Sequence, residues 1–244
     1  MYITLEGQIG TGKSTFARSW VSAHPGYLLL KEPLPHTLLG AFYANPRGFG
    51  FTFQMVMLTH RLVQAETGSV QAPCVVDRGL VGDMAFALAS LRLGRTTATN
   101  FRIYLATARE LRSPGGTPSH VLYLHQTTAQ CLRRIQARGR AAEQSIDAAY
   151  LQCVEDAHQD LLLAWMATDW LDPYLGPCPT IKVALDGDAM VPGPAAYAAL
   201  PTAVVTPATG GWPWSSYLDR QAVWATLASG KPVRLEVPAA NILW

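Results

Sequence analysis

Near the start of the chain, glycines, a lysine and a serine stand at a spacing whose chemistry suits phosphate groups. The segment 7–14 reads GQIGTGKS and directly follows the strand-like run YITLE. The glycines let backbone N–H groups turn toward phosphate oxygens, the lysine adds positive charge, and the serine hydroxyl can ligate Mg²⁺. This context favours a nucleotide-binding loop over an ordinary glycine-rich turn. The residues that we expect to hold the phosphates are Gly7, Gln8, Ile9, Gly10, Thr11, Gly12, Lys13, Ser14 and Thr15.

Charged side chains follow three other apolar runs. Glu32 stands just before a proline, and its carboxylate could accept the proton of a hydroxyl that is being phosphorylated. Asp77 could join Ser14 in holding Mg²⁺, and Arg78 could bind a phosphate or a hydroxyl. Asp186 follows the last apolar run and is a further candidate for nucleotide binding. Taken singly, each of these could also be a solvated turn residue or part of a surface ion pair.

A stretch rich in aromatic side chains indicates a slot for a planar ring. The segment 42–54 reads FYANPRGFGFTFQ, in which Gln54 follows Phe53 and supplies one amide. Gln54 and Arg61 are seven positions apart, which puts them on one helix face at a separation of roughly 10 Å. Two long side chains can close that distance around one ligand. Packing in the core is the alternative for the aromatic residues.

Arginines gather in a short segment further along the chain. The segment 134–140 reads RIQARGR, so Arg134 and Arg138 share a helix face and Gly139 lets the chain turn before Arg140. Such a segment is often a solvated basic face. Because a phosphate loop is already present, we interpret these arginines as a lid that clamps phosphates.

Alternating apolar runs and helical stretches predict the elements that position these residues. A parallel sheet flanked by helices explains this alternation, and its ligands collect beyond the carboxyl ends of the strands. The runs predicted as strands, each buried on both faces, are 2–5, 27–30, 74–76, 120–124 and 180–185. The stretches predicted as helices are 14–23, 51–67, 82–93, 99–112, 128–138, 146–166 and, near the end of the chain, about 215–229. The predicted class is α/β with a five-stranded parallel sheet.

Composition narrows the class of protein. With 244 residues, 49% hydrophobic and 15% charged, the chain can bury a full core. A net charge of +2 without a long basic run argues against a nucleic acid polymer or a membrane as partner. The four cysteines are scattered, so neither a zinc site nor a disulfide framework is indicated, and a reducing, cytoplasmic location is expected.

The composition shifts toward Pro, Ala, Gly and Trp after residue 188. The repeated prolines prevent long regular elements. We therefore predict one domain over residues 1–189 and an irregular C-terminal extension over 190–244. Its tryptophans carry too much apolar surface for water, so it packs on the core or at a subunit contact.

Together these segments resemble the deoxynucleoside kinase family over about Tyr2 to Asp188. The shared motifs, in family order, are the phosphate loop, Glu32-Pro33, the Y-x-x-P and F-x-F-Q of residues 43–54, Asp77-Arg78, and R-x-x-x-R-G-R-x-x-E-Q over 134–144. The resemblance implies a P-loop kinase fold with an arginine-rich lid. It also implies a homodimer that moves the γ-phosphoryl group of ATP to the 5′-hydroxyl of a 2′-deoxynucleoside, with Mg²⁺.

The same resemblance implies roles for individual residues. Glu32 would hold the 5′-hydroxyl with Arg78 beside it, while Lys13 and the lid residues Arg134, Arg138 and Arg140 would stabilise the transferred phosphoryl group. Tyr43 and Glu143 would bind the 3′-hydroxyl, and the Tyr43 ring would crowd a ribose 2′-hydroxyl. Gln54 would bind the base edge with Phe53 packed nearby.

Arg61 and Asp83 stand where family members that accept cytosine or purines carry an arginine–aspartate pair. We therefore expect deoxycytidine or a purine deoxynucleoside as substrate. Phe86 precedes Ala87, the position where the family often has a base-stacking phenylalanine.

Two alternatives stay open at this point: a thymidine kinase of the herpes type, which also carries an Asp-Arg pair, and a non-catalytic nucleotide-binding regulator. A generic small-metabolite kinase would leave Tyr43, Gln54 and Glu143 unexplained.

Overall fold

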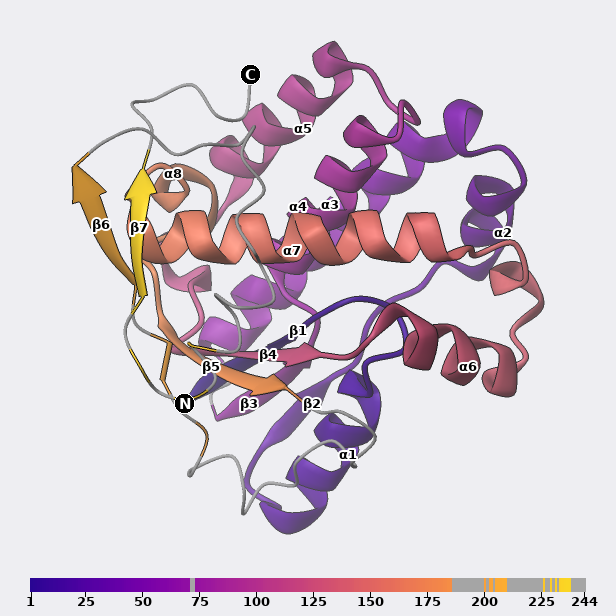
Figure 1. Cartoon of the computed structure of the whole chain (residues 1–244). Coiled ribbons are helices and arrows are strands. Elements are labelled where there is room, and N and C mark those ends of the chain that lie inside the picture. Colours follow the sequence, from indigo (N-terminus) through magenta and orange to yellow (C-terminus); the bar gives the residue numbers. More distant parts are fainter. Residues whose placement is uncertain are drawn as a thin grey trace.

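Five parallel strands form one sheet at the centre of the fold (Figure 1). The computed structural model describes residues 1–70, 73–185, 200, 202–203, 205–209, 226, 229, 231 and 233–237. The strands follow the order β2-β3-β1-β4-β5 across the sheet. Their bounds are β1 Tyr2–Glu6, β2 Leu28–Leu30, β3 Cys74–Asp77, β4 His120–His125 and β5 Thr180–Leu185. The α/β class and the five predicted strands are confirmed.

Strand β2 contradicts the expectation that every strand is buried on both faces. It lies at the edge of the sheet, next to β3, and Leu28 is 41% exposed. The central strands β1 and β3 are buried at every position. An edge strand has a neighbour on one side and less cover from helices, so an apolar run alone does not guarantee burial.

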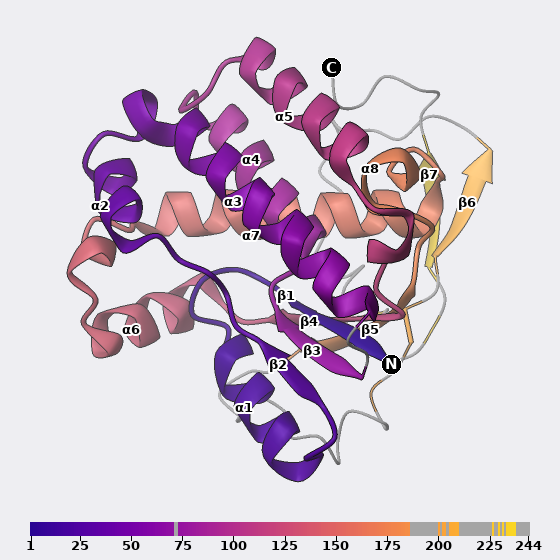
Figure 2. The same ribbon diagram turned by 180° about the vertical axis from the view of Figure 1, so that it is seen from behind.

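Helices cover both faces of this sheet (Figures 1 and 2). Helix α1 lies against one face, and α3, α4, α5 and α7 lie on the opposite side. The helix bounds are α1 Lys13–Ala23, α2 His36–Ala44, α3 Pro46–Val70, α4 Leu80–Arg92, α5 Ala98–Leu111, α6 Thr128–Arg138, α7 Ala148–Ala167 and α8 Asp172–Leu175. Two short 3₁₀ turns lie at Pro114–Gly116 and Ala141–Glu143.

Six of the predicted helical stretches are helices in the structure, although the boundaries differ by several residues in places. The predicted helix over 215–229 lies outside the described residues except for 226 and 229. Helix α3 begins at Pro46 rather than at Phe51, because proline is tolerated in the first turn, where its missing N–H has no helical partner. Helices α2 and α8 were not predicted. The first is a short apolar segment between prolines, and the second is a single turn.

The core consists of a layer on each side of the sheet. Ile3, Leu5 and Leu122 point to the α1 side, where they pack with Phe16 and Trp20. The alternate residues of β4, Val121 and Tyr123, point the other way, toward α4, α5 and α7. This alternation follows from the two-residue period of a strand, and it makes a three-layer α/β/α arrangement.

The described part of the C-terminal extension meets the edge of β5. The Ala203 N–H donates to the Ile181 carbonyl at 2.8 Å, and Lys182 Nζ donates to the Leu200 carbonyl at 2.8 Å. The boundary predicted near residue 189 lies outside the described residues, as does Asp186.

Further along, β6 Val205–Thr209 and β7 Val233–Val237 form a two-stranded parallel sheet. The prediction of an irregular extension is therefore corrected for these residues. Pro207 is compatible with β6 because a strand at an edge can leave one backbone position without a ladder donor.

Cys74, Cys131, Cys153 and Cys178 are free thiols in the structure. Among the described residues, none of the helices combines the length and the apolar character that crossing a membrane requires.

Phe16 provides a test of the α1 layer, because it is 1% exposed beneath the sheet. Replacing it with alanine removes a buried ring and leaves a cavity, so Phe16→Ala is expected to lower the free energy of unfolding by roughly 3–5 kcal/mol. Denaturant unfolding measures the change. The control Ser19→Ala, on the exposed face of α1, is expected to stay within about 0.5 kcal/mol of the wild type. Equal effects of the two changes would contradict the packing described.

Candidate active site

The phosphate loop connects β1 to α1 through backbone that only glycine tolerates at its two ends. Gly7 has φ +131°, and a Cβ there would lie 2.3 Å from the Leu124 carbonyl oxygen. Gly12 precedes α1 with φ 101° in the left-handed region. The loop can therefore wrap closely, with the positive end of α1 beside it.

Lys13 turns its ammonium group back into this loop. Its Nζ donates to the carbonyls of Gly7 and Gln8, at 2.9 and 2.7 Å, and the residue is 6% exposed. Burial and the neighbouring charge of Arg78 lower the pKa of Lys13 to about 8. The group is still mainly protonated at pH 7, and phosphate oxygens could replace the loop carbonyls as its acceptors.

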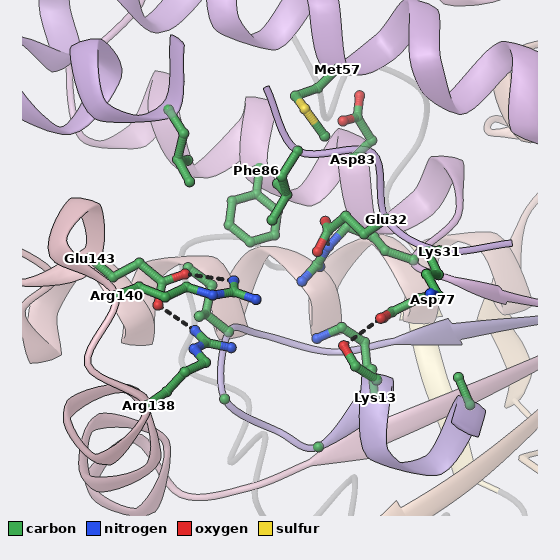
Figure 3. Close-up of a pocket in the computed structure, with 18 of the residues that line it drawn as sticks. Lys13, Lys31, Glu32, Met57, Asp77, Asp83, Phe86, Arg138, Arg140 and Glu143 are labelled. Atoms are coloured by element: carbon green, nitrogen blue, oxygen red, sulfur yellow. Dashed lines mark hydrogen bonds and ion pairs between the residues drawn. The ribbon is translucent and has the colours of Figure 1, made fainter. Parts of the chain in front are cut away.

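The predicted lid arginines lie next to the loop and to one another. Arg134, on α6, donates to the carbonyls of Gly10 and Thr11, each at 3.3 Å. Arg138 and Arg140 both pair with Glu143, at 2.5 and 3.2 Å (Figure 3). Glu143, predicted to bind a sugar hydroxyl with Tyr43, thus holds the lid in this structure. Its spacing of five and three residues from these arginines makes the contact local.

Oxygen ligands suited to Mg²⁺ lie at the start of α1 and the end of β3. The Ser14 hydroxyl donates a short hydrogen bond to the Asp77 carboxylate. The other carboxylate oxygen, Oδ1, is buried and has no hydrogen-bond partner among the described residues. Such hard oxygens fit Mg²⁺, which takes few protein ligands and completes its shell with water and phosphate oxygens. Among the residues that the structure describes, no group of three or more His, Cys, Asp or Glu side chains is placed to hold a metal ion.

Glu32, at the carboxyl end of β2, is held by two arginines. Its Oε1 accepts from Arg61 Nη2 at 2.5 Å and from Arg78 Nε at 2.9 Å. Arg78 also donates from Nη1 to the Gly7 carbonyl at 2.9 Å, so one guanidinium joins Glu32 to the phosphate loop.

The two arginines determine the protonation state of Glu32. Burial alone would raise its pKa, but the charges of Arg78 and Arg61 outweigh burial and lower the pKa to about 2. Glu32 is therefore a carboxylate at neutral pH. It can accept a hydrogen bond from a hydroxyl, but it is a weak base.

One cavity of about 540 Å³ extends from the phosphate loop to the aromatic segment. In Figure 3, Glu32 lies between its Lys13–Asp77 end and its Met57–Asp83 end. The predicted residues that line it are Ile9, Gly10, Gly12, Lys13, Ser14, Thr15, Glu32, Tyr43, Phe53, Gln54, Arg61, Asp77, Arg78, Asp83, Phe86, Arg134, Arg138, Arg140 and Glu143. The fold therefore brings together side chains from most of the motifs.

The far end of the cavity has aromatic walls and buried polar groups. The ring of Phe53 stacks on Phe42 at 4.9 Å, and Phe86 lies under the Arg78 guanidinium at 4.5 Å. Gln54 donates from Nε2 to the Asp83 backbone carbonyl at 3.1 Å. A planar, partly polar ligand would suit these walls.

Arg61 and Asp83 both line this end but bind other residues. Arg61 is 1% exposed and donates to Gln64 at 2.8 Å as well as to Glu32. The Asp83 carboxylate accepts from Tyr104 at 2.7 Å, and burial raises its pKa to about 6. In this structure Arg61 and Asp83 are therefore not paired with each other, and each binds residues outside the expected pair.

Comparison with known proteins agrees with this geometry. Residues 3–192 match the family model described as deoxynucleoside kinase. The chain belongs to the deoxynucleoside kinase family. Enzymes of this family phosphorylate deoxynucleosides. The chain is therefore assigned to the kinases.

Curated relatives and solved structures agree. A deoxyguanosine kinase from Dictyostelium discoideum is 30% identical over 168 residues, covering 66% of this chain and 58% of that protein. A deoxyguanosine kinase from Lactobacillus acidophilus is 26% identical and covers 76% of this chain and 80% of that protein. A structure of deoxyadenosine kinase from M. mycoides with bound dCTP has a TM-score of 0.61 and 25% identity, covering 76% of this chain and 92% of that one.

Several buried residues in or beside this kinase's cavity belong to none of the sequence motifs. Tyr150 lines the cavity with its ring edge-on to Tyr43, at 6.4 Å, and Met57 also lines it. Tyr104 holds Asp83 from a helix that carries no motif. Glu6 ends β1, fully buried, and accepts from the Gly79 N–H at 2.9 Å. A glutamate within an otherwise apolar run was the one available signal for Glu6.

Glu6 generates a testable pH dependence. Burial raises its pKa from 4.5 to about 7, so the folded protein keeps a proton that the unfolded chain loses above pH 4.5. The resulting stabilisation is complete below pH 4.5 and is lost as the pH rises through 7. Relative to wild type, Glu6→Gln is expected to gain stability over this range, on the order of 3 kcal/mol in total. Denaturant unfolding from pH 4 to 8 measures it.

The matched control is Glu66→Gln, which neutralises an exposed carboxylate on α3. We expect its unfolding free energy to stay within about 0.5 kcal/mol of the wild type. A difference between Glu6→Gln and wild type that does not change with pH would contradict the buried, proton-holding Glu6.

Proposed function

We propose that this chain transfers the γ-phosphoryl group of ATP to the 5′-hydroxyl of a 2′-deoxynucleoside, with deoxycytidine or a purine deoxynucleoside preferred. The observation that carries the proposal is the shared cavity, in which the Lys13 loop, the carboxylate of Glu32 and the amide of Gln54 face the same space. A phosphate donor, a sugar hydroxyl and a base could then be held together.

The phosphate end supplies positive charge where the transferred group becomes negative. Lys13, Arg134, Arg138 and Arg140 line this side of the cavity. Phosphoryl transfer passes through a loose transition state, so catalysis relies on alignment and on charge stabilisation. When Mg²⁺ is bound, it would neutralise charge between the phosphates, and Ser14 and Asp77 would hold it.

The acceptor end aligns the hydroxyl. The 5′-oxygen forms a bond to the γ-phosphorus as the bond from that phosphorus to the ADP oxygen breaks, and the hydroxyl proton passes to a Glu32 oxygen. A carboxylate with a pKa near 2 suits this order, because it orients the hydroxyl first and takes the proton late. Arg78 would keep Glu32 ionised and in position.

The proposed preference for cytosine or a purine rests on the far end of the cavity and on the names of the relatives. Relatives are named as deoxyguanosine, deoxyadenosine and deoxycytidine kinases. Arg61 and Asp83 offer a donor and an acceptor beside Gln54, which suits a base edge that carries both kinds of group. Tyr43 would exclude a ribose 2′-hydroxyl.

The two open alternatives have less support. A non-catalytic regulator would not require the Glu32–Arg78 pair beside the phosphate loop. A thymidine kinase would not require Arg61 and Asp83. The predicted homodimer, the cytoplasmic location and the use of ATP as donor stay predictions.

A panel of nucleosides with radiolabelled ATP and Mg²⁺ tests the proposal. Labelled 5′-monophosphate is expected from deoxycytidine, deoxyadenosine or deoxyguanosine, with thymidine a poor competitor and ribonucleosides poorer than their deoxy forms. Phosphorylation of thymidine alone would favour the thymidine kinase. No labelled monophosphate from any nucleoside would favour the non-catalytic regulator.

Glu32→Gln tests the acceptor end. Loss of the proton acceptor is expected to lower kcat at least a hundredfold, because a positioned general base contributes about 10²–10⁴ in rate. Binding of the nucleoside, measured by calorimetry, should change much less. The control is Glu110→Gln, which alters an exposed carboxylate and should keep wild-type kcat. Wild-type turnover in Glu32→Gln would remove Glu32 from the mechanism.

A further inference from the structure

A histidine outside the cavity touches the guanidinium that holds Glu32. His158 lies in the middle of α7 and is 0% exposed. Its Nδ1 lies 2.8 Å from the Val154 carbonyl, and its Nε2 lies 3.4 Å from Arg78 Nη1. A carbonyl only accepts, so Nδ1 carries the proton and Nε2 offers a lone pair to the arginine.

The surroundings of His158 keep it neutral. Burial, and then the charge of Arg78, lower the pKa of His158 well below its ordinary value. A neutral imidazole can accept from a guanidinium, whereas a protonated one would repel it. The ring is thus an acceptor for Arg78 over the whole neutral range.

Arg78 needs such an acceptor because its charge is buried and its backbone has an uncommon conformation. It has φ 75°, in the left-handed region that non-glycine residues rarely occupy, and it is 4% exposed. Nη1 has two N–H bonds, and the structure gives it two acceptors, the Gly7 carbonyl at 2.9 Å and His158 at 3.4 Å. Nε donates to Glu32. A buried guanidinium with a missing acceptor would turn to find another.

His158 also contacts the Phe86 ring, which packs against the Arg78 guanidinium. The Phe86 ring lies 4.5 Å from Arg78 Cζ, and the His158 ring meets Phe86 edge-on, at 5.9 Å and 84°. Phe86 and Arg78 line the cavity, and His158 is fully buried behind them. A ligand in the cavity would therefore meet Arg78 and Phe86 without touching His158.

We propose that His158 is a positioning residue, which fixes the plane of the Arg78 guanidinium and thereby the Glu32 carboxylate that faces the acceptor hydroxyl. The catalytic part of this inference rests on the proposed function, because it concerns the alignment of a 5′-hydroxyl. The contact between His158 and Arg78 does not depend on which substrate is bound. The two parts are therefore tested separately.

The catalytic part is tested with His158→Leu and His158→Gln. Leucine removes the acceptor, whereas the glutamine amide oxygen can take the place of Nε2. His158→Leu removes a hydrogen bond to a charged group. It is therefore expected to lower kcat for the nucleoside about tenfold or more, with KM changed less. His158→Gln is expected to keep kcat within about threefold of the wild type. Equal loss in both variants, or wild-type kcat in His158→Leu, would overturn the proposal.

The control for lost packing is Leu162→Ala, one turn further along α7 and also 0% exposed. It is expected to lower Tm but to keep wild-type kcat at a temperature where all variants are folded. A fall in kcat like that of His158→Leu would show that general loosening of α7 is sufficient, and would overturn the proposal.

The contact is tested without any activity, by a double-mutant cycle in unfolding free energy with Arg78→Met. His158→Leu is expected to cost less stability when Arg78 is already absent. Additive effects would overturn the contact. If the cycle shows coupling but the wild-type protein phosphorylates no deoxynucleoside, the contact is supported and the proposed function is rejected.

Discussion

The burial of the Arg78 guanidinium is the interaction on which the site depends. A charge taken out of water must be paired, and breaking such a pair is strongly destabilising. Arg78 meets this requirement by binding Glu32 from the end of β2 and the Gly7 carbonyl from the end of β1. Because Arg78 itself follows β3, a single side chain ties the carboxyl ends of three strands together. The phosphate loop and the candidate acceptor carboxylate are held in one frame as a result.

Several cations around the cavity are hydrogen-bonded within the protein. Lys13 binds loop carbonyls, Arg138 and Arg140 share Glu143, and Arg61 binds Glu32. Each of these cations has partners that an anionic or polar ligand could replace. The exchange keeps each group hydrogen-bonded, so it avoids the cost of leaving a buried charge unpaired. The same cations therefore serve the stability of the fold and the proposed chemistry.

Local patterns predicted the elements well, because most of them depend on neighbouring residues. The apolar runs of β1 and β3 and the helix over Thr128–Arg138 follow from periodicity and capping signals. The exposure of Leu28 in β2 and the helix His36–Ala44 were not predicted, since they depend on position within the sheet and on packing against α3. Strands in the extension were likewise hidden by its prolines.

The sequence by itself determined the phosphate loop, the α/β class and the motif residues, because spacing along the chain sets backbone geometry and local chemistry. Only the tertiary structure decided which partners these residues have. Arg61 binds Glu32 and not Asp83, Tyr104 holds Asp83, and Glu143 binds the lid arginines. Nothing in the sequence marks His158 as a neighbour of the site, and Glu6 is marked only as a glutamate that ends an apolar run beside the phosphate loop. Contacts between residues far apart in the chain arise from how helices and strands pack, and a pattern of neighbouring residues does not record that.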